Sequence, residues 1–219
     1  MKYQQFPAII FTLITSSLLL TACGVDSSSN DYNYNGSTQL TSDEISGLLF
    51  MREEEELARD LYIDIYEAKG SRLNTFQNIS VNAETKHAEA IRVLLERYDI
   101  DDPSTGVHNT YKDQELQDLY DQLFNIAIGS DDLAALRVGA LVEETDIRDI
   151  NSYKAMVSDE KQDIIDTYDN LLCGSRNHLR AFVSQIEGIT GSSYVVQIPA
   201  LYDEVQEILN TPRERCGRK

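Results

Sequence analysis

Hydrophobic residues recur every three to four positions through most of the chain after residue 41, which is the spacing of amphipathic α-helices. Gly70, the Asp-Asp-Pro sequence at residues 101–103 and Gly188 interrupt this pattern, as helix-breaking residues do. Strand-like character is confined to residues 194–196. Between the breaks we predict helices at residues 43–68, 75–98, 113–128, 130–156, 158–187 and 199–210. The sequence therefore predicts an all-α domain over residues 41–210.

Four consecutive glutamates, residues 53–56, lie in the first predicted helix, and such a run is typical of a solvated face. At helical spacing, however, Glu54 falls at the centre of the apolar stripe and Glu55 lies on its flank. Glu53 and Glu56 point well away from it. The stripe consists of Phe50, Met51, Leu57, Ala58, Leu61 and Ile65. The pattern predicts that Glu54 is buried and that its three acidic neighbours face solvent.

Glu84 and His87 form a Glu-x-x-His motif within the second predicted helix. Residues three apart are neighbours on a helix surface, so this carboxylate and imidazole can close on one ion. Their face also carries apolar residues and should point into a core, namely Phe76, Ile91, Leu94 and Tyr98. Because an unpaired charge is costly to bury, the pair requires a partner.

The next two long helices also bring polar groups to apolar faces. Glu143 and Glu144 flank the stripe of the fourth predicted helix about equally, so periodicity does not decide which one points inward. A duplicated helical hairpin would favour Glu144. The interval from Glu144 to His178, 34 positions, nearly equals the interval of 33 positions from Glu54 to His87. In the fifth predicted helix, His178 lies on the buried side, three residues after Ser175.

Ligand-type groups from four helices are thus expected to face one another. A single buried histidine or glutamate is more often a hydrogen-bonded core residue, but the coincidence of five such groups favours a metal. Three carboxylates and two imidazoles suit iron or manganese, and also zinc, and they offer no soft thiolate for Cu(I). The predicted ligands are Glu54, Glu84, His87, Glu144 and His178, with Glu143 and Asp146 as further candidates.

The pattern resembles ferritin-like di-metal carboxylate proteins, in which two helices each supply a Glu and two others each supply a Glu-x-x-His. The resemblance covers about residues 43–187, and three blocks are similar to domain-of-unknown-function family 2202, at residues 52–60, 139–147 and 174–182. It implies an antiparallel four-helix bundle with additional short helices and one or two metal ions, most often iron. The chemistry implied is oxidation of Fe(II) or reduction of O₂ or peroxide.

One position departs from that resemblance, because the second motif reads Ser175-x-x-His178. Serine is a poor ligand, so the usual sixth protein group is missing unless Glu143 or Asp146 replaces it. Otherwise the site is asymmetric, holds a single ion, or binds the second ion weakly. A second hypothesis therefore stays open: a non-enzymatic metal-binding or structural protein of the cell envelope with a degenerate site.

The first 22 residues have the features of an export signal, with Lys2 followed by an apolar run that is too short to span a membrane. The run ends in Leu-Thr-Ala-Cys at residues 20–23, which resembles a bacterial lipobox. This resemblance implies cleavage before Cys23, lipidation of that cysteine and anchoring to the cell envelope, at the outer membrane or facing the periplasm in a diderm organism. An ordinary signal peptide is the alternative. Residues 23–40 are polar and predict a flexible tether.

The net charge of the chain limits the classes of molecule that it is expected to bind. Thirty-seven acidic and 19 basic residues give a net charge of −18, which argues against nucleic acid, since nucleic-acid binding depends on basic side chains. His108 is expected to be an exposed bystander, and the basic tail at residues 211–219 to be disordered. Cys173 and Cys216 can form a disulfide in an exported protein, but their spacing does not decide it. The sequence does not indicate an oligomeric state.

Overall fold

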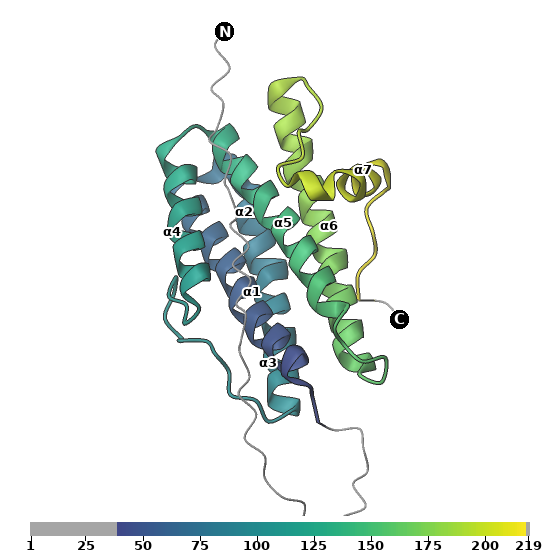
Figure 1. Ribbon diagram of the computed structural model, residues 1–219. Coiled ribbons are helices and arrows are strands. Elements are labelled where there is room, and N and C mark those ends of the chain that lie inside the picture. The colour runs from purple at the N-terminus through teal and green to yellow at the C-terminus, as the bar shows by residue number, and fades with distance from the viewer. Residues whose placement is uncertain (1–38, 218–219) are drawn as a thin grey trace, which may run out of the picture. The chain divides into compact units, whose positions relative to one another are not determined.

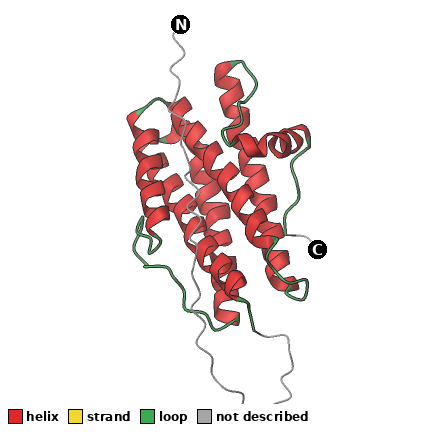
Figure 2. Cartoon of the chain, in the orientation of Figure 1, coloured by secondary structure: helices red, strands yellow, loops and turns green. Residues whose placement is uncertain are grey.

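The computed structural model describes residues 39–217, and within them the chain forms helices and no β-strand (Figures 1 and 2). The all-α prediction is confirmed. Two 3₁₀ turns, Ser71–Leu73 and Pro199–Leu201, precede the second and last of the α-helices. The helices are α1 (Ser42–Lys69), α2 (Asn74–Ile79), α3 (Thr85–Arg97), α4 (Gln114–Gly129), α5 (Asp132–Lys154), α6 (Gln162–Thr190) and α7 (Tyr202–Asn210).

Two further observations concern membranes. None of the helices within residues 39–217 combines the length and the apolar character needed to cross a bilayer. The expected signal peptide, the lipidation site Cys23 and most of the tether lie outside the described residues.

The beginnings of the helices are fixed by side-chain and backbone hydrogen bonds. Thr41 and Glu44 form a capping box at the start of α1, with the Thr41 backbone N–H donating to the Glu44 carboxylate at 2.7 Å. Ser158, where the sequence predicts the fifth helix to begin, donates its backbone N–H to Glu44 at 2.9 Å. Helix α6 begins only at Gln162, and the hydrogen bond from Ser158 to Glu44 attaches the segment before it to the start of α1.

The helix predicted over residues 75–98 is interrupted by a π-helical turn, Ser80–Glu84, which separates α2 from α3. Thr85 Oγ1 donates to the Ser80 carbonyl five residues earlier, at 2.9 Å. A π-helical turn adds one residue to the helical repeat and so changes which side chains share a face. It connects the buried Phe76 of α2 to the buried Glu84 without breaking the helical path.

The core is built where α1, α2, α5 and α6 meet. Figure 1 shows α5 and α6 running side by side, with α1 beside α5 and α4 on the outer flank of α1. The rings of Tyr62, Phe76 and Phe182 pack together with centroids 4.9 to 5.4 Å apart. Gly139 of α5 faces this group, and a Cβ there would lie 2.5 Å from the Phe182 ring. The small residue lets α5 approach α6 closely.

The loop between α3 and α4 covers one side of α1. Glu53 accepts hydrogen bonds from the backbone N–H groups of Lys112 and Asp113, at 2.5 and 3.1 Å. Glu56 pairs with Arg52 at 3.0 Å, and both are buried. The prediction that Glu53 and Glu56 face solvent is therefore wrong, because a distant part of the chain encloses them. Periodicity within α1 carries no information about that loop.

His108 belongs to the same loop and has more contacts than the sequence predicts. Its side chain is 44% exposed, and its two ring nitrogens lie 3.2 Å from Asp60 and 2.8 Å from Asp64. Asp60 also accepts the backbone N–H of Asn109 at 2.8 Å. His108 is therefore part of the attachment of this loop to α1, away from the polar core.

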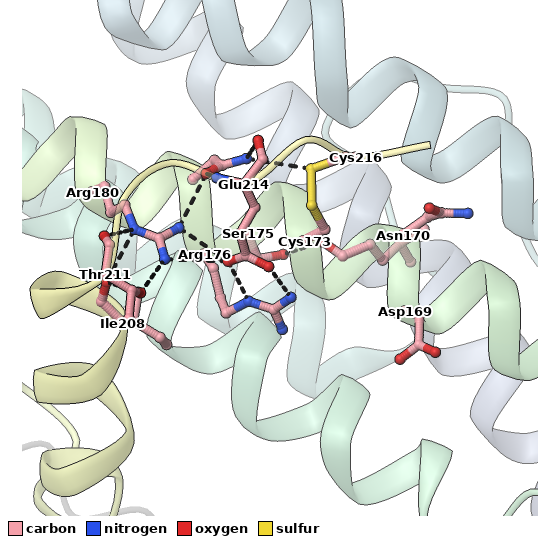
Figure 3. Close-up of polar contacts among 12 residues, drawn as sticks. Asp169, Asn170, Cys173, Ser175, Arg176, Arg180, Ile208, Thr211, Glu214 and Cys216 are labelled. Atoms are coloured by element: carbon pink, nitrogen blue, oxygen red, sulfur yellow. Dashed lines mark hydrogen bonds and ion pairs between the residues drawn. A yellow bond between two sulfur atoms is a disulfide. The ribbon is translucent and has the colours of Figure 1, made fainter. Parts of the chain in front are cut away.

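The segment after α7 is bound to the outer side of α6 (Figure 3). Cys216 forms a disulfide with Cys173. Glu214 accepts hydrogen bonds from Arg176 at 2.8 and 2.6 Å and from Arg180 at 3.2 Å. The expectation of a disordered tail is wrong for the residues described here, because an acidic residue within the basic segment pairs with two arginines of α6.

The disulfide should contribute strongly to stability, because it closes a loop of 43 residues. We expect Cys216→Ser to lower the free energy of unfolding by about 2–4 kcal/mol. Urea denaturation of the variant and of the oxidised wild-type chain measures the difference. The reduced wild-type chain is the matched control, and it should unfold at the same urea concentration as the variant. Coincident unfolding of oxidised and reduced wild type would contradict this role.

Candidate metal centre

In α1 the structure brings Glu55, rather than Glu54, to the Glu-x-x-His motif. Glu55 Oε2 lies 3.2 Å from His87 Nδ1. The inward face of α1 also includes Leu48 and Tyr62, both 0% exposed, and these two residues widen the apolar stripe so that it includes Glu55. Neither residue belongs to the stripe expected from the sequence. Glu54 is buried, as predicted, but the prediction that Glu55 faces solvent is wrong, and Glu55 is the acid that lies against His87.

Glu84 lies between the two histidines that the sequence singles out. Its Oε2 is 2.9 Å from His87 Nδ1, and its Oε1 is 2.8 Å from His178 Nδ1. The two imidazole rings stack with centroids 5.6 Å apart, and Glu84 itself is fully buried. One carboxylate therefore presents one oxygen atom to each imidazole.

Of the two adjacent glutamates in α5, Glu143 points toward this cluster. Its Oε2 lies 3.4 Å from His178 Nδ1, and its Oε1 accepts a hydrogen bond of 2.6 Å from the Tyr62 hydroxyl. Tyr62 also donates to the Gly139 carbonyl, at 3.2 Å. The aromatic layer of the core thus orients the carboxylate that faces His178.

Glu144 points the other way and holds the segment that precedes α7. It accepts hydrogen bonds from the backbone N–H groups of Gln197 and Ile198, at 3.0 and 2.7 Å, and from the Tyr194 hydroxyl at 2.8 Å. A carboxylate with these three neutral donors has no free lone pair directed at the histidines. The preference for Glu144 over Glu143 is therefore corrected: both are buried, but against different neighbours.

Space for the first histidine comes from a glycine in α6. A Cβ atom at Gly174 would lie 2.5 Å from His87 Nε2, closer than any side chain tolerates. The neighbouring Ser175 is also buried, and its hydroxyl donates to the Leu171 carbonyl at 3.1 Å. Ser175 therefore contributes no oxygen to the cluster, whereas Gly174 is needed for its shape.

Within residues 39–217, two sets of three ligand-type residues bring their atoms within 4.8 Å of one another. Glu84 belongs to both sets, so they form one continuous cluster. The sequence-predicted ligands that the structure brings together are Glu84, His87, His178 and Glu143, to which Glu55 is added. Glu54 and Asp146 are close by but belong to neither set.

Burial and mutual attraction determine the charges in this cluster. Burial disfavours the charged form of His178, but the carboxylates of Glu84 and Glu143 outweigh it and raise the pKa of His178 to about 10. Burial also opposes the charged form of Glu84, and the two histidines outweigh it and lower the Glu84 pKa. Burial raises the pKa of Glu55 to about 7. A cation that binds here must displace protons from the imidazoles.

Glu54 and Asp146 are the two predicted candidates that remain without partners. They are 3% and 0% exposed, and none of their four carboxylate oxygens makes a hydrogen bond. Burial, followed by the charges of Asp149 and Glu55, raises the Glu54 pKa well above its usual range. Glu144 differs from these two residues, because both of its carboxylate oxygens accept hydrogen bonds.

The structural role of Glu144 is testable. We expect Glu144→Ala to lower the free energy of unfolding by about 3 kcal/mol, because buried donors to a charged acceptor lose their partner. Hydrogen exchange should accelerate at the amides of Gln197 and Ile198. Gln197→Ala keeps the backbone donor and is the control in which exchange at Ile198 stays slow. Unchanged exchange in Glu144→Ala would show that other contacts hold this segment.

This chain is similar in sequence and in fold to known proteins. It is 37% identical over 180 residues to the uncharacterized protein MJ0754 of Methanocaldococcus jannaschii, an alignment covering 80% of this chain and 91% of that protein. It is also similar to the crystal structure of hypothetical protein MJ0754 from Methanococcus jannaschii DSM 2661, with a TM-score of 0.72 and 33% identity over 83% of this chain and 99% of that one. Residues 44–212 match the model of an uncharacterized protein domain, DUF2202, and the chain therefore belongs to the DUF2202 family.

Proposed function

We propose that this chain is a ferritin-like protein whose helical core would hold two transition-metal ions, with iron the best suited and Glu84 as the carboxylate between the two histidines. The observation that carries this proposal is the position of Glu84, whose two oxygen atoms lie 2.9 and 2.8 Å from two different imidazole nitrogens. Glu55 stands on the His87 side and Glu143 on the His178 side. A carboxylate placed in this way can hold two ions side by side.

The orphaned atoms of the cluster fit such ions. Glu84 Oε1 and His178 Nδ1 lie 2.8 Å apart, yet neither makes a hydrogen bond of normal geometry. Glu143 Oε2 is likewise buried without a hydrogen-bond partner. Atoms that converge without bonding to one another are suitably placed for a shared cation.

The donor set and its origin support the ferritin-like comparison. The residues come from α1, from the π-helical turn and α3, from α5 and from α6, which parallels the four-helix supply of ligands in ferritin-like di-metal proteins. Carboxylates and imidazoles together suit iron or manganese, and also zinc. We therefore also propose that the long helices of this chain form a four-helix bundle of the ferritin-like class.

When bound, an iron pair supplies electron exchange with O₂ or peroxide, and so the proposed reaction is oxidation of Fe(II) or reduction of those oxidants. The residues of this chain hold the ions, exclude bulk water and position protons. Tyr62 fixes Glu143 through its hydroxyl, and Tyr62, Phe76 and Phe182 form an apolar layer over the cluster. His87 and His178 must lose their protons when the ions bind.

Ser175 favours a second candidate function. Its hydroxyl is bonded to the Leu171 carbonyl, so α6 supplies one ligand where a Glu-x-x-His motif would supply two. A site with one carboxylate fewer can retain ions without turning over an oxidant. The second candidate is therefore a non-enzymatic metal-binding or structural envelope protein.

The location of the protein is a separate proposal. The lipobox-like sequence ending at Cys23 supports export, cleavage and lipid anchoring to the cell envelope. Globomycin treatment of cells that express the chain should cause an uncleaved precursor to accumulate, and Cys23→Ser should abolish lipid labelling. Normal processing in both cases would contradict the lipoprotein assignment.

Metal content tests the proposed centre. Protein purified without chelator and desalted should retain about two ions per chain, and His87→Ala and His178→Ala should each retain about one. His108→Ala, which removes the third histidine of the chain, is the matched control and should retain both ions. Elemental analysis by mass spectrometry measures the content, and circular dichroism checks that each variant is folded.

Two outcomes separate the candidates. Less than about one ion per two wild-type chains, or equal content in all the histidine variants, would contradict the centre. If the ions are retained, O₂ consumption on addition of Fe(II) supports turnover. Retained ions without O₂ consumption support the binding protein instead.

Gly174→Ala tests the geometry without removing a ligand. The new methyl group should displace the His87 ring, so the folded variant should lose about one ion and bind the remainder at least about tenfold more weakly. Gly188→Ala, in the same helix with open space around it, is the control and should match wild type in metal content. Equal metal affinity in the two variants would show that His87 is not a ligand.

A further inference from the structure

His108 lies between two aspartates of α1 that take no part in the proposed centre. Its Nε2 is 2.8 Å from Asp64 Oδ1, and its Nδ1 is 3.2 Å from Asp60 Oδ1. The two acids are four positions apart and therefore neighbours on the helix surface. A single imidazole ring thus spans two carboxylates, with one at each ring nitrogen.

The protonated ring is the form that fits this geometry. A neutral imidazole has one N–H group, so its other nitrogen would direct a lone pair at a carboxylate oxygen, whereas an imidazolium donates from both nitrogens. Burial opposes the charged form of His108, but the hydrogen bond to Asp64 and the charges of Asp60 and Asp64 outweigh it and raise the pKa of His108.

Further charged and titratable groups surround the first of these acids, Asp60. Arg59 Nε donates to Asp60 Oδ1 at 2.8 Å and opposes a positive charge on His108. Glu56 pairs with Arg59 at 3.4 Å. From the loop between α3 and α4, the Tyr111 hydroxyl donates to Asp60 at 3.4 Å. Apart from Arg59, no cation in the described residues is assigned an effect on His108.

The second acid, Asp64, is bound from α4 as well as from the loop. The Tyr120 hydroxyl and the Asn109 side-chain amide both donate to its Oδ2. Burial opposes the charged form of Asp64, but the hydrogen bonds from Tyr120 and then from His108 outweigh it and lower the pKa of Asp64. Asp64 is therefore ionised throughout the pH range in which His108 titrates.

The backbone of the loop directs His108 toward α1. Gly106 and Asn109, on either side of it, have positive φ values of +69° and +52°, which glycine and asparagine tolerate best. The Asn109 backbone N–H donates to Asp60 at 2.8 Å. Residues of the loop and of α1, with His108 and Asp60 among them, line a cavity of about 420 Å³. Movement of the ring therefore changes the wall of this cavity.

We propose that His108 is a pH-sensitive clamp, which holds the loop against α1 while its imidazole is protonated and releases the loop and opens the adjoining cavity when the imidazole loses its proton. A histidine whose pKa is raised by folding stabilises the folded arrangement fully below its ordinary pKa of about 6.5, and this contribution is lost as the pH rises through the raised value. The contribution of Asp64, whose pKa is lowered, is lost only as the pH falls through that lowered value. The clamp is therefore strongest between the ordinary pKa of an aspartate, about 3.9, and that of a histidine.

Two measurements on the full chain test the clamp. Nuclear magnetic resonance titration of the His108 ring should give a midpoint above about 6.5. Hydrogen exchange, corrected for the intrinsic rate at each pH, should show that protection of the Asn109 amide falls across the same midpoint, about tenfold for each pH unit by which the midpoint exceeds the ordinary value. A midpoint at or below about 6.5, or constant protection of Asn109, would overturn the proposal.

Asp64→Asn removes one negative charge and leaves the size of the side chain unchanged. The His108 midpoint should move down toward the ordinary value, and the loss of protection at Asn109 should become smaller. Asp118→Asn, which removes an exposed acid of α4 that accepts from Gln114, is the matched control and should titrate as wild type does. Equal midpoints in the two variants would show that the net charge of the chain, and not the clamp, sets the titration.

His108→Gln removes the titrating group itself. In the folded variant, protection of Asn109 should already be at least about tenfold lower than in wild type at a pH of about 6. It should then stay constant up to a pH of about 9, because no imidazole remains at this position. A fall in protection with pH that persists in this variant would assign the pH dependence to another group and contradict the clamp. Circular dichroism checks that each variant is folded.

Discussion

The concentration of buried negative charge is the constraint on which this structure depends. Two imidazoles stand against five enclosed carboxylates, those of Glu54, Glu55, Glu84, Glu143 and Asp146. Two like charges about 4 Å apart repel by about 4 kcal/mol at an effective dielectric constant of 20. Even with both imidazoles protonated, the cluster remains negative unless carboxylates also take up protons. Metal cations can replace these protons, and the unpartnered oxygens are a reason to expect that they do.

The buried acids of this fold have two kinds of surroundings, and the difference separates acids with a structural role from those of the proposed centre. Glu53 and Glu144 each bind neutral backbone donors, and by doing so they fasten a loop and the segment before α7 to the long helices. Glu84 and Glu143 instead face imidazoles and each keep an oxygen without a hydrogen bond. The first arrangement is complete within the chain, whereas the second leaves oxygens unused, which is why a cation is proposed there.

Sequence periodicity predicts the helices and the inward direction of Glu84, His87 and His178, because each lies on a face whose other residues are apolar. It fails where one helix packs on more than one side. Glu143 and Glu144 are both buried, and only the partners brought by other segments distinguish them.

The other failures share that cause. Glu53 is enclosed by a loop that is distant in sequence, since Lys112 of that loop lies 59 positions after it. The residues of α1 alone therefore do not indicate that Glu53 is buried. The π-helical turn before Thr85 likewise leaves no mark in a pattern read at 3.6 residues per turn. For Glu55, in contrast, the signal was present in Leu48 and Tyr62.

The corrected ligands also change the relation between the two halves of the site. The equal intervals that suggested a duplicated hairpin do not survive the replacement of Glu54 by Glu55 and of Glu144 by Glu143. With the Ser175 hydroxyl bonded to the Leu171 carbonyl, His178 depends on Glu84, which His87 also uses. Two ions bound as proposed are therefore coupled through one carboxylate. The His178 position relies on it more strongly, because Glu143, the other carboxylate on that side, already accepts a hydrogen bond from Tyr62.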